Sequence, residues 1–127
     1  MEEFIAQKRR RILLVDDAVD DVQMLAELLN HLGQEARAVV DGTQALAIVS
    51  SFAPDVVILD LDMPGLDGFE VAQALKQMPG LEKMGVFALS GWADESVRER
   101  CLQLGFDRFF CKPIPANQIL KALAKFG

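Results

Sequence analysis

One aspartate, Asp60, stands where a side chain can act on a ligand. It ends the apolar run 56–59 and is followed at once by Leu61-Asp62-Met63-Pro64-Gly65, which has the composition of a tight loop. Ligands of open α/β sheets bind outside the carboxyl ends of the strands, so a carboxylate at this point is placed for chemistry. With a reference pKa near ~4, it is ionised at neutral pH and can attack a phosphoryl group without a general base. Asp60 is therefore a candidate nucleophile for phosphoryl transfer.

Two further acids, Asp16 and Asp17, follow another short apolar run, residues 12–15. If these two strands are neighbours in the sheet, three carboxylates meet at one edge and repel one another unless a cation is bound. Mg²⁺ prefers oxygen ligands and commonly takes one or two protein carboxylates plus a phosphate oxygen. We expect Asp17 and Asp60 to bind Mg²⁺ directly and Asp16 to act through water. For Asp16 or Asp17 taken alone, a helix cap is an equally good explanation.

A hydroxyl and a lysine end two later apolar runs. Ser90 follows residues 86–89, and Lys112 follows residues 109–111, so both are expected at the same rim of the sheet as Asp60. Phosphoryl transfer needs positive charge and hydrogen-bond donors around the phosphoryl oxygens. Pro113, directly after Lys112, is a candidate for a cis peptide bond. Each of these residues alone is more often structural, but together at the ends of four strands they indicate a phosphoryl-binding site.

Apolar runs of strand length alternate five times with stretches of helical period. The strands are expected at Arg11–Val15, Glu35–Val39, Val56–Asp60, Gly85–Ser90 and Arg108–Cys111. The helices are expected to begin, in chain order, between residues 17 and 20, after Asp41, after Asp67, after Asp94 and at residues 115–117. In the last helix, Leu120, Leu123 and Ala124 should face the core. This alternation predicts an α/β fold whose parallel sheet is covered on both faces.

Length and charge limit the classes of protein. The 127 residues, 51% of them hydrophobic, fit one domain at residues 11–127 after a lead-in at residues 1–10. The net charge of −6 repels phosphate backbones and argues against direct nucleic-acid binding. Partners should therefore be proteins or small ions.

Cysteine usage and hydropathy bear on the compartment. Cys101 and Cys111 lack a CxxC spacing and are expected to be reduced thiols of a cytoplasmic protein. The basic run 8–11 precedes an apolar run of only four residues, far shorter than a signal sequence or a membrane span. His31, the single histidine, is expected at the surface.

Four motifs together resemble the receiver domain of two-component response regulators. They are Leu14-Val15-Asp16-Asp17, Leu59-Asp60-Leu61-Asp62-Met63-Pro64-Gly65-Leu66-Asp67-Gly68, Ala88-Leu89-Ser90-Gly91 and Cys111-Lys112-Pro113. The resemblance implies a flavodoxin-like, doubly wound (βα)5 fold with a five-stranded parallel sheet in the order 2-1-3-4-5. It also implies a regulator that takes a phosphoryl group from a histidine kinase or a histidine phosphotransfer protein. Because the sequence stops at the fifth helix, we expect a stand-alone regulator.

The same resemblance assigns roles to single residues. Asp60 would be the phosphoacceptor, the backbone carbonyl of Asp62 would complete the Mg²⁺ site, and Lys112 would contact the phosphoryl group. Ser90 would be the switch hydroxyl, and Phe109, where many members have tyrosine, would turn inward with it. The change would reach a downstream protein through the face made by the fourth helix, the fifth strand and the fifth helix.

Two other functions remain open from the sequence. Asp60-Leu61-Asp62 after an apolar strand also resembles the acid pair of haloacid-dehalogenase-like phosphatases, although Pro64 departs from that pattern and the pair Asp16-Asp17 would have no role there. The other possibility is a receiver-like binding module that is never phosphorylated.

Overall fold

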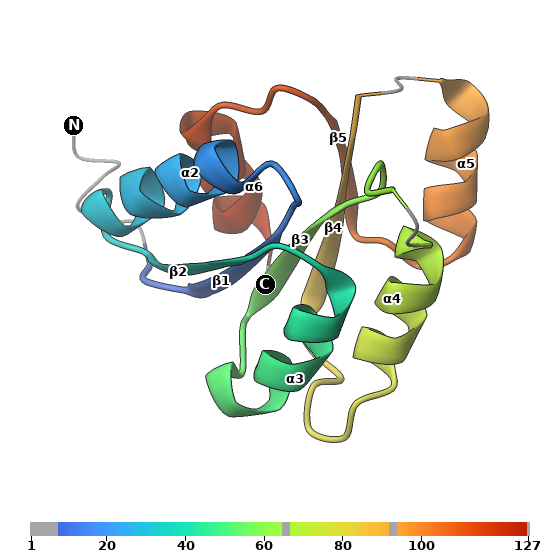
Figure 1. Ribbon diagram of the computed structural model, residues 1–127, viewed down its shortest axis with the longest axis horizontal. Helices are drawn as coiled ribbons and strands as arrows, with labels where there is room; N and C mark the ends of the chain where they lie inside the picture. The colour runs from blue at the N-terminus through green and yellow to red at the C-terminus, as the bar shows by residue number, and fades with distance from the viewer. Residues whose placement is uncertain (1–7, 65–66, 92–93, 127) are drawn as a thin grey trace.

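Five parallel strands form one sheet in the order β2-β1-β3-β4-β5 (Figure 1). The computed structural model describes residues 8–64, 67–91 and 94–126. The strands are β1 (Arg11–Val15), β2 (Glu35–Val39), β3 (Val56–Asp60), β4 (Gly85–Ser90) and β5 (Arg108–Cys111), with the predicted bounds. The predicted strand order is confirmed, and it makes β1 and β3, which precede the acids, direct neighbours.

Five helices cover the two faces of this sheet. They are α2 (Val19–His31), α3 (Gly42–Phe52), α4 (Gly68–Lys76), α5 (Glu95–Gln103) and α6 (Ala116–Lys125). In Figure 1, α2 and α6 lie on one side of the sheet and α3, α4 and α5 on the other. The fold is therefore the flavodoxin-like (βα)5 arrangement that the sequence predicts.

Alternation along each strand divides the apolar side chains between two cores. Leu13 and Val15 of β1 join the core that includes residues of α3, α4 and α5, whereas Ile12 and Leu14 join the core that includes residues of α2 and α6. Every residue of β3 and β4 is buried, as expected for central strands of a sheet covered on both faces. The two cores hold Asp60 and Ser90 on rigid strands.

The register aligns the carboxyl ends of the strands. Val15 pairs with Leu59, Leu59 with Ala88, and Ser90 with Cys111. Each of the residues singled out above therefore either ends its strand or follows that end directly, at one edge of the sheet.

Aspartates cap three helices as predicted. The side chains of Asp41, Asp67 and Asp94 each accept a hydrogen bond from a backbone N–H in the first turn of α3, α4 and α5. The first helix begins at Val19, within the expected range, but Ala18 occupies its N-cap position and supplies no side-chain bond.

One inward position of the last helix was predicted wrongly. Ala124 is exposed, because the buried stripe of α6 runs instead through Ala116, Ile119, Leu120 and Leu123. His31 lies at the surface, as expected. Within the part of the chain that the structure describes, no helix is both long and apolar enough to cross a bilayer.

Candidate functional site

The carboxylate of Asp60 lies at the end of β3 with only 1% of the residue exposed. Its Oδ1 accepts a hydrogen bond of 2.8 Å from the backbone N–H of Asp62. The Nζ atom of Lys112 lies 2.7 Å from Oδ2, a short ion-pair distance. A buried carboxylate is therefore held in place by one amide and neutralised by one ammonium group.

Asp16 and Asp17 meet Asp60 as predicted. One carboxylate oxygen from each of the three residues lies within 4.8 Å of the others. Such a group of oxygen donors suits a hard divalent cation such as Mg²⁺. Asp16 Oδ1 also accepts a hydrogen bond of 3.0 Å from the N–H of Ala18, which precedes α2, so Asp16 closes a local turn and is not the N-cap of that helix.

The surroundings of Asp16 change its proton affinity. The pKa of Asp16 is raised from 3.8 to about 6, mainly by burial of this half-buried carboxyl and also by the charge of Asp60 and a hydrogen bond to Asp60. The N–H of Ala18 and the charge of Lys112 act in the opposite direction without cancelling the rise. Asp16 therefore keeps its proton to a higher pH than an exposed aspartate does, and a bound cation would compete with that proton.

Stability and Mg²⁺ binding should therefore depend on pH in opposite ways. Because the pKa of Asp16 is raised in the folded state, the protonated carboxyl contributes to the free energy of unfolding. This contribution is complete below about pH 4 and is lost as pH rises through about 6. Mg²⁺ must displace the same proton, so its affinity should rise over this window. We expect the gap in melting temperature between Mg²⁺ and EDTA samples to be larger at about pH 7.5 than at about pH 5.

The matched control for this pH effect is Asp16→Asn, which removes the titrating group. In that variant the gap in melting temperature should change little with pH between the two conditions. An equal gap at both pH values in the unsubstituted protein would contradict the prediction.

Lys112 is positioned by the backbone and by its charged neighbours. Its N–H donates 2.9 Å to the carbonyl of Ser90, and the Lys112–Pro113 peptide bond is cis, as the sequence suggested. Partial burial alone would lower the pKa of Lys112, but a hydrogen bond and the charge of Asp60, with the charges of Asp16 and Asp62, raise it above its usual value. The ammonium group is therefore charged at neutral pH.

Ser90 ends β4 with 1% exposure, and its hydroxyl donates a hydrogen bond of 2.9 Å to Asp62 Oδ1. The other oxygen of Asp62, Oδ2, accepts a hydrogen bond of 2.6 Å from the backbone N–H of Gly91 and lies 3.8 Å from Lys112 Nζ. The side chain of Asp62 thus connects the loop after β3 with the end of β4.

A close approach fixes the backbone next to Asp60. A Cβ atom at Gly68, the first residue of α4, would lie 2.8 Å from Leu61 Cδ2 and 3.2 Å from Leu61 Cα. Only glycine lets the helix start this close to the residue after Asp60. The loop that carries Asp62 is therefore held between β3 and α4.

Phe109 lies in β5 beside Ala88, is half-buried and packs against the core that includes residues of α5. Asp16, Asp17, Asp60 and Lys112 come together as expected, and Ser90 joins them through Asp62. Gly65, Leu66 and Trp92 lie outside the described residues. The sequence placed Asp62 beside the site as a fourth acid, but the hydrogen bonds of its carboxylate were not predicted. No local pattern could have revealed them, because they span 28 and 29 residues.

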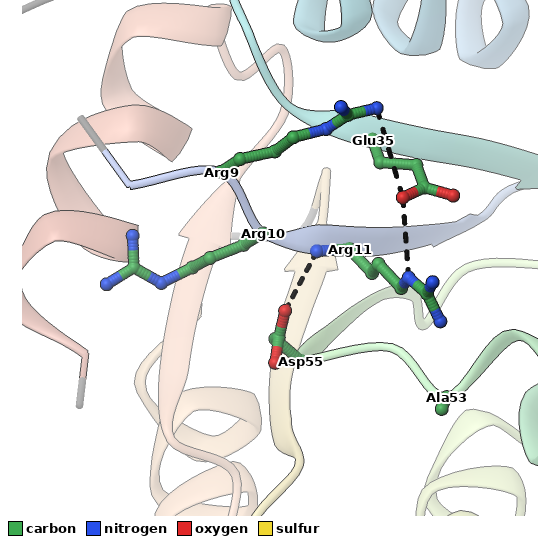
Figure 2. Close-up of a pocket in the computed structure, with 6 residues that line it drawn as sticks. All are labelled: Arg9, Arg10, Arg11, Glu35, Ala53 and Asp55. Carbon is green, nitrogen blue, oxygen red and sulfur yellow. Dashed lines mark hydrogen bonds and ion pairs between the residues drawn. The ribbon is translucent and has the colours of Figure 1, made fainter. Parts of the chain in front are cut away.

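A recess lies at the opposite edge of the sheet, where β1 to β3 begin (Figure 2). It has a volume of about 380 Å³ and is lined by Arg9, Arg10, Arg11, Glu35, Ala53 and Asp55. The backbone N–H of Arg11 donates 2.9 Å to Asp55, and its guanidinium pairs with Glu35 at 3.3 Å. Arg11 thus contacts both acids of the recess, Glu35 and Asp55, and these residues form a polar cluster that joins β1, β2 and β3.

Comparison with known proteins assigns the family. A profile described as "Response regulator receiver domain" matches residues 12–124. The sensor histidine kinase RcsC of Salmonella typhi is 34% identical over 117 residues, which are 91% of this chain and 12% of that protein. Protein RcaC of Microchaete diplosiphon is 29% identical over 119 residues, 91% of this chain and 18% of that protein. The chain thus spans less than a fifth of the length of these relatives.

Solved structures agree with this fold. Chemotaxis protein CheY4 of Vibrio cholerae has a TM-score of 0.86 at 26% identity, over 94% of this chain and all of that one. The receiver domain of a sensor histidine kinase from Pseudomonas aeruginosa PAO1, solved with a magnesium ion coordinated in its active site cleft, has a TM-score of 0.80 at 26% identity, over 94% of this chain and 98% of that one. None of these relatives supports the phosphatase alternative. The profile match and the shared fold show that this chain belongs to the response regulator receiver domain family, the phosphoacceptor signalling domains of two-component systems.

Proposed function

We propose that Asp60 is the residue that accepts the phosphoryl group, in a reaction that requires Mg²⁺. The observation that carries this proposal is the setting of its carboxylate, which is buried, 2.7 Å from the Lys112 ammonium and grouped with the oxygens of Asp16 and Asp17. The donor would be a phosphohistidine of a histidine kinase or a histidine phosphotransfer protein. The relatives that are sensor histidine kinases support this class of partner.

The transfer exchanges one bond for another. An oxygen of Asp60 attacks the phosphorus, a P–O bond forms, and the bond from phosphorus to the imidazole nitrogen of the donor breaks. The electron pair of that bond stays on the nitrogen, so no general base is needed on this chain. Lys112 can stabilise charge on the phosphoryl oxygens, because its ammonium already lies beside the attacking carboxylate.

The acids supply the Mg²⁺ site in this proposal. Asp17 and Asp60 would bind the ion directly, Asp16 would act through water, and the backbone carbonyl of Asp62 would complete the set. When bound, Mg²⁺ would neutralise charge on the phosphoryl oxygens and on the acid cluster. The domain would then carry out only its own phosphorylation and dephosphorylation, without turnover of a separate substrate.

The signal would leave through protein contacts. Ser90 and Phe109 would report phosphorylation to the face made by α5, β5 and α6, where a downstream protein would bind. We expect no direct nucleic-acid contact, because the net charge is −6. Four further points stay predictions. They are the receiver unit at residues 11–127, the lead-in at residues 1–10, the stand-alone protein and the cytoplasmic location.

The test is an intact-mass measurement after incubation with acetyl phosphate, with Mg²⁺ in one sample and EDTA in the other. We expect one labile phosphoryl adduct in the Mg²⁺ sample and none with EDTA, because the acids and the phosphoryl oxygens repel one another without the cation. An adduct that forms equally in EDTA would contradict the metal requirement. No adduct under either condition, with a phosphohistidine donor also inactive, would favour the module that is never phosphorylated.

A further inference from the structure

The carboxylate of Asp62 accepts hydrogen bonds from two donors at the end of β4. The Ser90 hydroxyl donates to Oδ1 at 2.9 Å, and the Gly91 N–H donates to Oδ2 at 2.6 Å. Bonds to an ionised carboxylate are shorter and stronger than neutral ones. The end of β4 is therefore fastened to the loop after β3 by one acidic side chain.

Asp62 is well placed to compete with a phosphoryl group on Asp60. Its backbone N–H bonds Asp60 Oδ1, and its own Oδ2 lies 3.8 Å from the Nζ atom that pairs with Asp60 at 2.7 Å. Carboxylate and phosphoryl oxygens are both anionic acceptors, so each can bind the same hydroxyl, amide and ammonium groups. One set of donors cannot fully serve both anions at once.

We propose that the Asp62 carboxylate stands in for the phosphoryl group in the unphosphorylated protein. It holds the Ser90 hydroxyl and the Gly91 amide until phosphorylation of Asp60 displaces it. This inference rests on the proposed function, since it concerns the regulation of the same site. Asp62 is then a positioning residue that opposes switching: the population of the switched conformation is reduced by the free energy needed to break its two bonds.

Two effects of Asp62 must be separated by the test. Its negative charge repels any incoming anion, whether or not it bonds Ser90. Competition for donors predicts more, namely that the effect of Asp62 depends on the presence of the Ser90 hydroxyl. A double-mutant cycle measures this dependence.

The experiment measures the affinity for beryllofluoride, an anionic analogue of the phosphoryl group, in the presence of Mg²⁺. Four proteins of residues 1–127 are compared: unsubstituted, Asp62→Ala, Ser90→Ala and the double variant, with Asp55→Ala as a matched control just before the far end of β3. Asp62→Ala leaves the backbone N–H and carbonyl in place. We expect it to bind about tenfold more tightly than the unsubstituted protein, because the donors no longer have to be released.

Ser90→Ala should change the affinity for beryllofluoride little when Asp62 is present, because on binding the hydroxyl only exchanges the Asp62 carboxylate for the analogue as its acceptor. In the Asp62→Ala background it should weaken binding about tenfold, because the bond to the analogue is then lost without compensation. Equal effects of Ser90→Ala in both backgrounds would overturn the proposal and leave charge repulsion alone. A failure of beryllofluoride to bind any of the proteins would count against the proposed function instead.

A second measurement tests the contact without any phosphoryl analogue. Both proteins are studied without phosphorylation. The amide proton of Gly91 should exchange with solvent more slowly in the unsubstituted protein than in Asp62→Ala, because only the unsubstituted protein has the 2.6 Å bond. Equal exchange rates in the two proteins would overturn the proposal, even if the receiver chemistry works.

Discussion

Replacing Asp60 with asparagine is expected to abolish the phosphoryl adduct. The amide has nearly the shape of the carboxylate, and its oxygen can still accept the Asp62 N–H, but neither amide atom is an anionic nucleophile. The same change removes one negative charge from the cluster with Asp16 and Asp17. We therefore also expect Asp60→Asn to be more stable than the unsubstituted protein in EDTA, because charge repulsion in the site is relieved. Intact mass and thermal unfolding check the two parts.

Asp55→Asn is the matched control for this experiment. Asp55 precedes the same strand, at the opposite edge of the sheet, where its side chain accepts the N–H of Arg11. Loss of that bond affects stability but not the chemistry at the other edge, so the adduct should form as in the unsubstituted protein. An adduct that persists in Asp60→Asn would move the phosphoacceptor to another residue.

Replacing Lys112 with alanine is expected to slow adduct formation by about 10² to 10³-fold. Its ammonium is the positive group that lies against the attacking carboxylate, and an alanine leaves the phosphoryl oxygens without that charge. The variant should also be less stable in EDTA, because Asp60 is then buried without its ion-pair partner. Mg²⁺ should restore part of this stability. The initial rate of adduct formation at saturating Mg²⁺, together with melting temperatures, measures both effects.

Two variants sharpen the interpretation of Lys112. Lys121→Ala removes an exposed lysine of α6 and should leave the rate unchanged. Lys112→Arg keeps the charge but places it on a broad planar group, so it should recover stability in EDTA more fully than the rate. A rate in Lys112→Ala equal to that of the unsubstituted protein would show that Mg²⁺ alone supplies the positive charge.

Strands β1, β3 and β4 could be predicted from the sequence because each is a short, largely apolar run that ends at or just before a polar residue. Burial on both faces makes β3 and β4 continuous apolar runs, so their ends are marked by Asp60 and Ser90 themselves. The starts of helices could also be predicted where an aspartate caps the first turn, as Asp41 does for α3. The last helix was harder, since its many alanines and leucines fit more than one stripe, and only packing against the sheet decided that Ala124 faces solvent.

Local patterns were enough to predict the fold class, the five strands and the set of acids, hydroxyl and lysine at their carboxyl ends, because strand ends, caps and breakers are encoded within a few residues of one another. The bonds of Asp62 to Ser90 and Gly91, and the burial beside Asp60 that raises the pKa of Asp16, are properties of the folded molecule alone. These depend on distances between strands far apart in the chain, which are set when both faces of the sheet pack and no local pattern records them.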